Sequence, residues 1–447
     1  MPDPTSIPTT AFSGAERAAV GVVGFRCAVC DASVGIEEVL VFRCPNWTAD
    51  DPYHSLRIVQ RDAPVRPVFE SANPFLAYRP YFAWDSFASA VGLSEPTRWG
   101  LVRDLDARIA AVDGTGFVAT PFHRSNALSD SLGFVSFGGV WVKDETHQVA
   151  GSHKARHLFS TLLYLRSIEL AGLAPWGSGP AGRPPLAIAS CGNAALAAAT
   201  LALAAEWPIQ VFVPTAADAV VTQRLAGLEA TVSVCPRRSS DPAGDPCVLR
   251  YREAVAAGAL PFSVQGPENV WCLDGGRTIG WEMALSLDVA HLFVQVGGGA
   301  LARCTIGGYA QVGGSLPQLH AVQTEGCAPL ARAWRRAGVG PGGVGAAAQH
   351  WREYMTPWET IPQSAADGIL DDETYDWLGV FAGLAASRGA PVITTEAEIL
   401  AANDLARSTT QVNASHTGTA VLAGLIAIRD TVSNHEKVAV IFSGTRR

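Results

Sequence analysis

From about Leu93 onward, short runs of apolar residues alternate with longer stretches of helical pattern. The runs predicted as strands are 140–143, 184–189, 209–213, 291–296, 319–323 and 438–442. Each run is almost continuously apolar, so both faces of each strand are expected to be buried, as is typical of parallel sheets. The intervening segments 154–170 and 194–206 are predicted as helices. The sequence therefore predicts an α/β fold with mostly parallel sheets covered by helices on both faces.

The composition argues against several classes of protein. The chain has 447 residues, of which 48% are hydrophobic and 17% charged, and its net charge is −8. These values exclude a disordered chain and argue against nucleic-acid binding. The longest apolar run, 194–205, is too short to span a membrane, so no membrane partner is expected. Nine scattered cysteines and an N-terminal segment, 1–13, without the features of a secretory signal predict a cytoplasmic protein.

Residues 1–75 are predicted as a small separate module. Cys27 and Cys30 form a C-x-x-C pair, and Cys44 follows on a second short apolar run. This is part of a zinc-ribbon pattern, in which two such pairs supply four thiolates. The second pair is incomplete, and the nearest other possible ligand is His54. We therefore expect a degenerate ribbon without a metal.

Polar or glycine-rich turns follow several predicted strands, where open α/β sheets bind their ligands. The first such turn contains Lys154, at the start of a predicted helix. Lysine also occurs at Lys143 and Lys437 but nowhere else, so chemistry that requires a lysine amine has three candidates. An amine among apolar neighbours can form a Schiff base, whereas the alternative is an ordinary solvated lysine.

Three further turns are candidates for a binding site. Ser190-Cys191-Gly192-Asn193 offers groups that could hold a carboxylate, although capping of the next helix is an equally good explanation. Gly297-Gly298-Gly299-Ala300-Leu301 follows a strand, and its backbone N–H groups could bind a phosphate. The turn 442–445, which contains Ser443, is generic by itself.

The glycine turn also permits a different interpretation. Residues 297–302 fit the dinucleotide pattern G-x-G-x-x-A, and Glu325 ends the next apolar run where a ribose-binding acid would lie. A nicotinamide-dependent dehydrogenase is therefore an alternative. It leaves the turns at Lys154, Ser190 and Ser443 unexplained.

Taken in order, these turns resemble the fold-type II pyridoxal-phosphate enzymes, most closely threonine synthase and the tryptophan synthase β-subunit. The resemblance runs from Thr120 to the C-terminus. It includes Gly151-Ser152-His153-Lys154, the segments 274–278 and 324–329, and Ser415-His416-Thr417-Gly418. Ala155 departs from the threonine synthase pattern, which has an acid after the lysine. The cysteine module is also similar to that of some threonine synthases.

The resemblance implies roles for individual residues. Lys154 would be the catalytic Schiff-base lysine, and Gly297, Gly298, Gly299, Ala300 and Leu301 would bind the cofactor phosphate with His153 close by. Asn193 would face the cofactor ring, and Ser190, Cys191 and Gly192 would hold the substrate carboxylate. Ser443 would face the pyridine nitrogen. A neutral hydroxyl there does not force that nitrogen to be protonated, which favours loss of a leaving group over transamination.

The resemblance also implies a fold and a function. The fold would have two open, twisted, mostly parallel sheets, with 76–150 and 251–447 in a large domain and 151–250 in a small mobile domain. The protein would be a homodimeric, pyridoxal-phosphate-dependent lyase or synthase acting on a small amino acid. We expect threonine-synthase-like chemistry on O-phosphohomoserine or a related substrate, with a threonine or serine dehydratase or a β-substituted-alanine synthase as alternatives. A third class, an inactive relative that serves as a binding module, is disfavoured because Lys154, Asn193, the glycines and Ser443 are all present.

Overall fold

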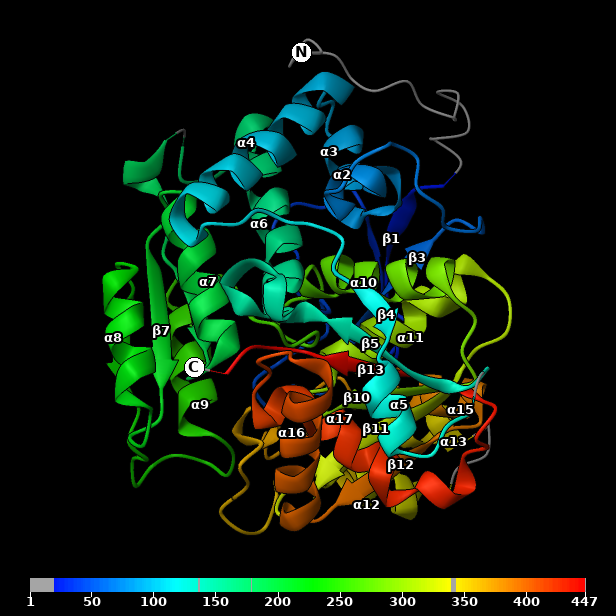
Figure 1. Cartoon of the computed structure of the whole chain (residues 1–447). Coiled ribbons are helices and arrows are strands. Elements are labelled where there is room, and N and C mark those ends of the chain that lie inside the picture. The colour runs from blue at the N-terminus through cyan, green and yellow to red at the C-terminus, as the bar shows by residue number, and fades with distance from the viewer. Residues whose placement is uncertain (1–19, 136, 178, 339–342, 447) are drawn as a thin grey trace.

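The computed structural model describes residues 20–135, 137–177, 179–338 and 343–446 (Figure 1). Residues 1–13, used above to predict the cellular compartment, lie outside this part. All six predicted strands are present, with small shifts at their ends. The run 184–189 begins as a strand only at Leu186, because Pro184 and Pro185 lack the backbone N–H that pairing requires.

A six-stranded sheet forms the centre of the larger part of the molecule. Its strand order is β12-β11-β10-β13-β5-β4, and all neighbours are parallel except β4 and β5. The strands are β4 Phe122–Arg124, β5 Gly139–Asp144, β10 His291–Gln295, β11 Gln318–Thr324, β12 Ala390–Thr394 and β13 Lys437–Phe442. In Figure 1 the red β13 lies beside the cyan β5, although most of the chain separates them in sequence.

Helices cover both faces of this sheet. Alternating residues of the strands enter two separate cores, as Leu292 and Phe293 illustrate. Leu292 packs with α11 and α15, whereas Phe293 packs with α16 and α17. The helices of this part are α5 Asn126–Ser131, α10 Cys272–Ser286, α11 Ala300–Val312, α12 Pro329–Ala337, α13 Gly343–Gln349, α14 Trp351–Tyr354, α15 Trp377–Ser387, α16 Glu396–Thr410 and α17 His416–Ala427. The predicted covering of both faces is confirmed.

A second sheet has four parallel strands in the order β8-β7-β6-β9. The strands are β6 Leu186–Ala189, β7 Ile209–Val213, β8 Thr231–Val234 and β9 Leu260–Pro261, and the helices around them are α4 Glu95–Asp113, α6 Lys154–Leu170, α7 Asn193–Ala204, α8 Ala219–Gly227 and α9 Pro246–Ala256. One face packs against the Ala-rich α7, and the other packs against α9 through Cys247 and Tyr251. The predicted two-sheet α/β architecture is therefore confirmed.

A small antiparallel sheet, β2-β1-β3, precedes these two. It comprises β1 Val22–Cys27, β2 Ser33–Gly35 and β3 Leu56–Gln60, followed by α2 Pro74–Ala77 and α3 Ala83–Ala90. The sheet is packed firmly on the rest of the molecule, because the ring of Phe25 meets Trp271 of the segment before α10 at 5.0 Å between centroids. The backbone N–H of Leu40 also donates to the Tyr164 hydroxyl at 2.7 Å.

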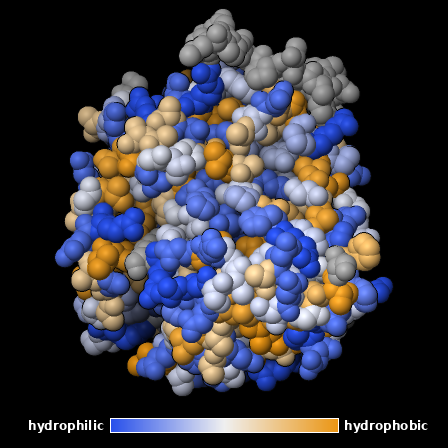
Figure 2. Space-filling model, viewed as in Figure 1, coloured by the Kyte–Doolittle hydropathy of each residue, from blue (hydrophilic) through white to orange (hydrophobic). Residues whose placement is uncertain are grey.

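The described helices include none that is both long and apolar enough to cross a membrane. Figure 2 shows hydrophilic and hydrophobic residues interspersed over the visible face of the molecule.

Candidate active site

The structure brings together turns from both large sheets and the start of α6. Ser152 forms an isolated antiparallel bridge with Gly444, directly after β13. A Cβ on Gly444 would lie 2.6 Å from the Asn193 amide nitrogen at the start of α7, so the two segments touch. The turns that contain Lys154, Asn193 and Ser443, which are remote in sequence, therefore meet at one place.

Of the three lysines, Lys154 is the one whose amine has no ion pair, hydrogen bond or aromatic-ring contact within the described residues. Lys143 is buried and donates to Glu282 and to the carbonyl of Thr120 at 2.5 and 2.7 Å. Lys437 lies over the ring of Trp141. Burial lowers the pKa of Lys154, and the acids Asp371 and Asp376 oppose this effect. A larger share of Lys154 is thus uncharged, which both a nucleophile and a general base require.

Ser443 lies at the carboxyl end of β13 and is buried. The side-chain amide of Gln295, the last residue of β10, donates to the Ser443 hydroxyl oxygen at 2.5 Å. Because that oxygen already accepts a hydrogen bond, its own proton remains available for an acceptor in the site. Gln295 was missed by the sequence analysis; the signal was a polar residue at the end of an apolar strand, directly before the glycine turn.

His153 is neutral and holds the end of β13. Burial, followed by the charge of Lys154, lowers its pKa well below the ordinary value. Its ring Nδ1 lies 2.9 Å from the carbonyl oxygen of Ser443, which can only accept, so Nδ1 carries the proton. The buried Nε2 then has a free lone pair and no partner in the described part of the chain.

The glycine turn forms the N-terminus of α11. Gly299 is the N-cap residue and has φ +93°, a conformation that favours glycine. A Cβ on Gly297 would lie 2.3 Å from the Asp371 carboxylate and 2.9 Å from the Ile369 Cα, so no larger residue fits there. The turn is thus covered closely by the segment 367–376.

The segment 367–376 belongs to a polar stretch, 349–376, whose sequence, together with the Gly-rich 338–345, is typical of an insertion or mobile segment. Residues 339–342 lie outside the described part of the chain. Instead, the backbone N–H of Asp376 donates to the carbonyl of Gly298 at 2.7 Å, and the Asp371 carboxyl accepts from the N–H of Gly298. Burial raises the pKa of Asp371 to about 6, and Lys154 opposes the increase. No sequence motif marks Asp371, because only folding brings it to the glycine turn.

The Ser190–Asn193 turn lies on the other side of the site. Helix α7 begins at Asn193 after the N-cap Gly192, and no side chain caps it. The Ser190 hydroxyl instead accepts from the N–H of Gly192 at 3.3 Å. Partial burial and then the carboxylates of Asp367, Asp245 and Asp371 raise the pKa of the Cys191 thiol. Side-chain capping therefore does not explain this turn, which faces the 367–376 segment.

Comparison with known proteins identifies the class of protein. A family model described as "Pyridoxal-phosphate dependent enzyme" matches residues 115–444, and the chain belongs to this family. A search of curated proteins gives no match. The predicted cofactor, pyridoxal phosphate, and the fold-type II assignment are confirmed.

Solved structures show the same fold at low identity. Maize serine racemase is 17% identical with a TM-score of 0.59, covering 78% of this chain and 93% of its own. The processed form of threonine deaminase isoform 2 from Solanum lycopersicum is 18% identical with a TM-score of 0.58. The match covers 79% of this chain and 91% of that one. An L-serine ammonia-lyase from Rhizomucor miehei is 17% identical with a TM-score of 0.55. The match covers 74% of this chain and 94% of that one. The resemblance is thus confirmed for the family but not for threonine synthase in particular.

The described residues fit pyridoxal phosphate. Lys154 supplies an amine that has no hydrogen bond or ion pair among these residues. The glycine turn supplies helix N-terminal N–H groups, and Ser443 supplies a hydroxyl proton. The family assignment replaces the alternative interpretation as a nicotinamide-dependent dehydrogenase. Its proposed ribose ligand, Glu325, accepts instead from the backbone N–H of Glu396, the first residue of α16, at 3.1 Å.

Proposed function

We propose that the protein eliminates a leaving group from Cβ of a small hydroxyamino acid or a related β-substituted amino acid, as serine and threonine dehydratases do. The similarity to deaminases and an ammonia-lyase supports this reading over O-phosphohomoserine chemistry. A homodimer remains an expectation from the family resemblance.

The observation that carries the proposal is the pairing of three arginines that could have bound a second phosphate. Arg156 pairs with Glu145 and Glu282 at 2.8 and 2.6 Å, Arg303 with Asp376 at 2.7 Å, and Arg277 with Asp274. Each arginine is therefore neutralised by an adjacent buried carboxylate.

Acidic residues near the site argue in the same direction. The pKa of the Cys191 thiol is raised in part by the charges of Asp367, Asp245 and Asp371. Cys191 belongs to the turn proposed to hold the substrate. Carboxylates at that position repel a substrate phosphate dianion in addition to the substrate carboxylate, which the turn itself would hold. A neutral hydroxyl leaving group adds no such repulsion, which favours serine-like or threonine-like substrates.

The proposed mechanism uses the residues described above. Bound pyridoxal phosphate supplies an aldehyde for amines and an electron sink for the negative charge at Cα. The N–H groups of 297–301 would bind its phosphate, that of Gly298 after its release from the Asp371 carboxyl. Asn193 and the Ser443 hydroxyl would orient its ring. Lys154, once released from the aldehyde, would take the proton from Cα, and the turn 190–192 would hold the substrate carboxylate. Closure over the substrate would keep water away from the charge at Cα.

The division into domains is also proposed on this basis. Residues 76–150 and 251–447 would hold the cofactor, residues 1–75 would remain a module at their edge, and residues 151–250 would move. Strand β9, Leu260–Pro261, pairs with β6. The smaller sheet therefore includes a short strand that lies beyond residue 250 in the sequence.

The test uses full-length protein loaded with pyridoxal phosphate and supplied with L-serine, L-threonine or O-phospho-L-homoserine. We expect ammonia and a 2-oxo acid from a hydroxyamino acid, and little phosphate from O-phospho-L-homoserine. Lys154→Ala should lose this activity and also the pyridoxyl mass that borohydride fixes on the Lys154 peptide of the unaltered protein. Rapid phosphate release, or a pyridoxyl group fixed elsewhere, would contradict the proposal.

A further inference from the structure

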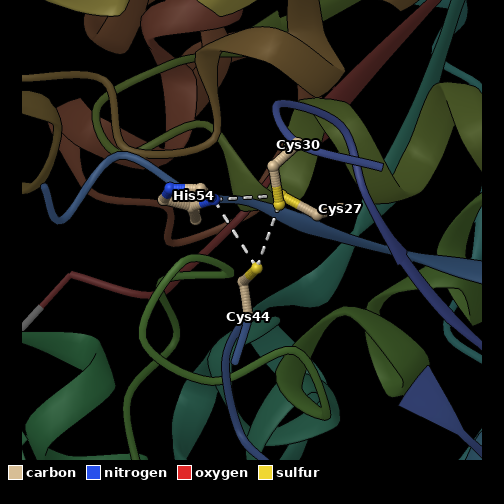
Figure 3. Close-up of side chains that lie close together, drawn as sticks. All are labelled: Cys27, Cys30, Cys44 and His54. Atoms are coloured by element: carbon tan, nitrogen blue, oxygen red, sulfur yellow. Dashed lines mark hydrogen bonds between the residues drawn. The ribbon is translucent and has the colours of Figure 1, made fainter. Parts of the chain in front are cut away.

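Four potential metal ligands from three separate segments converge at the edge of the N-terminal sheet. Cys27 ends β1 and Cys30 lies in the turn that follows it, Cys44 lies between β2 and β3, and His54 lies shortly before β3. One atom from each of the four side chains lies within 4.8 Å of the others. Figure 3 shows the sulfur atoms and the His54 ring pointing toward one another.

The distances match the edges of a zinc-centred tetrahedron. With Zn–S of about 2.3 Å and Zn–N of about 2.0 Å, tetrahedral geometry requires about 3.8 Å between sulfurs and about 3.5 Å between sulfur and nitrogen. The His54 Nδ1 lies 3.5 Å from the sulfurs of both Cys27 and Cys44. The sulfurs of Cys30 and Cys44 are 3.6 Å apart, well beyond a disulfide bond, and all these cysteines are free.

Neighbouring polar groups favour the orientation of the His54 ring and the thiolate form of the cysteines that metal binding requires. The other ring nitrogen of His54, Nε2, lies 3.4 Å from an Asp51 carboxylate oxygen, as in the carboxylate–histidine–metal arrangement that orients a ligating imidazole. The Val29 backbone N–H donates to the Cys27 sulfur at 3.4 Å, and the Asn46 side chain donates to the Cys30 sulfur at 3.3 Å. Such donors stabilise thiolates rather than thiols.

We propose that Cys27, Cys30, Cys44 and His54 bind one zinc ion in a structural site. Three thiolates and one imidazole complete a four-coordinate shell and leave no open position for substrate, and this soft donor set suits zinc. Binding displaces three thiol protons and leaves the site with a net charge of −1. This inference reverses the expectation of a metal-free ribbon, because folding supplies in His54 the ligand that the incomplete second pair lacks.

The site would stabilise the contact between the N-terminal sheet and the cofactor-binding part. Directly after His54, the Ser55 hydroxyl and the Leu56 carbonyl both accept from Arg303 of α11, at 3.1 and 2.6 Å. Arg303 also binds Asp376, whose backbone N–H donates to Gly298. The proposed ion would thus fix the chain where it meets the helix that begins at the glycine turn.

The experiment measures metals in the full-length protein, purified without chelator from cells grown with zinc. We expect about one zinc per chain in the unaltered protein. We also expect near-complete loss in His54→Ala and retention in His54→Cys, which restores a four-thiolate site. Cys235→Ala, a buried cysteine outside the cluster, is the matched control and should keep its zinc. Zinc in His54→Ala equal to that in the unaltered protein, or iron in place of zinc, would overturn the proposal.

A second measurement keeps the proposal testable if the variants fold poorly. The unaltered protein is stripped of metal and titrated with cobalt(II), which gives intense visible absorption when it is tetrahedral and bound to thiolates. We expect saturation at about one cobalt per chain, displacement by zinc, and a higher unfolding temperature after either metal is added. A cobalt spectrum without thiolate bands, with the number of reactive thiols in the metal-free protein unchanged when zinc is added, would overturn the proposal.

Discussion

Lys154 and Ser443 show how neighbouring groups set the properties of single side chains in this site. Burial lowers the pKa of Lys154. The hydrogen bond from Gln295 leaves the Ser443 hydroxyl with a proton to donate. Neither property follows from the residue type alone, since each depends on a contact across the fold.

The side chain at position 443 is expected to decide whether negative charge at Cα leads to elimination or to transamination. In Ser443→Asp, a carboxylate at the position proposed to face the cofactor nitrogen would favour protonation of that nitrogen and therefore transamination. We expect the elimination rate to fall at least about tenfold, equivalent to about 1.4 kcal/mol, and pyridoxamine phosphate to accumulate. The measurement is the ratio of 2-oxo acid to pyridoxamine phosphate. Ser443→Thr keeps the hydroxyl and should retain elimination; equal product ratios in the two variants would contradict the assignment.

Asp371 is expected to make stability depend on pH. Burial raises the pKa of Asp371 from 3.8 to about 6, so the folded protein binds this proton more tightly than the unfolded chain does. The resulting stabilisation is present below about pH 4 and is lost as the pH rises through about 6. Asp371→Asn should therefore raise the free energy of unfolding by about 3 kcal/mol at about pH 8 and by much less at about pH 4.

Urea unfolding at these two pH values measures the effect. Asp404→Asn, on the exposed surface of α16, is the control and should change stability little at either pH. If Asp371→Asn gave the same change at both pH values, the raised pKa of Asp371 would be refuted.

At the scale of elements, a buried charge network joins β5, α6 and α10. Arg156 on α6 pairs with Glu145, just after β5, and with Glu282 on α10, which also accepts from Lys143 of β5. These charges are almost fully shielded from water. The network thereby fixes the start of α6, where Lys154 lies, against the central sheet.

Breaking this network is expected to be costly. Arg156→Met should destabilise the protein by about 3–5 kcal/mol, because Glu145 and part of the Glu282 charge are left buried without a partner. Arg108→Met breaks an exposed pair with Glu206 and should cost less than about 1 kcal/mol. Denaturant unfolding of both variants measures the difference. Similar small losses in the two variants would show that the Arg156 network does not hold α6.

At the scale of the whole molecule, the strands could be predicted from sequence because each is a local apolar run. The strand order could not, since the place of β13 between β10 and β5 depends on contacts between remote segments. The same limit applies to the site. Lys154 and the glycine turn have local signals, and Ser443 is marked only by the family resemblance. The contacts of Asp371 and Gln295 and the approach of His54 to the cysteines arise only on folding.

The position of β13 has a consequence for biosynthesis. This strand fills the gap between β10 and β5, and Ser443 follows it directly. While residues 437–444 are still inside the ribosome, the nascent polypeptide exposes two unpaired strand edges and lacks one wall of the proposed active site. The large sheet therefore stays incomplete until these residues emerge, long after β5 and β10 have been made, and in that interval the emerging chain has most need of protection from aggregation.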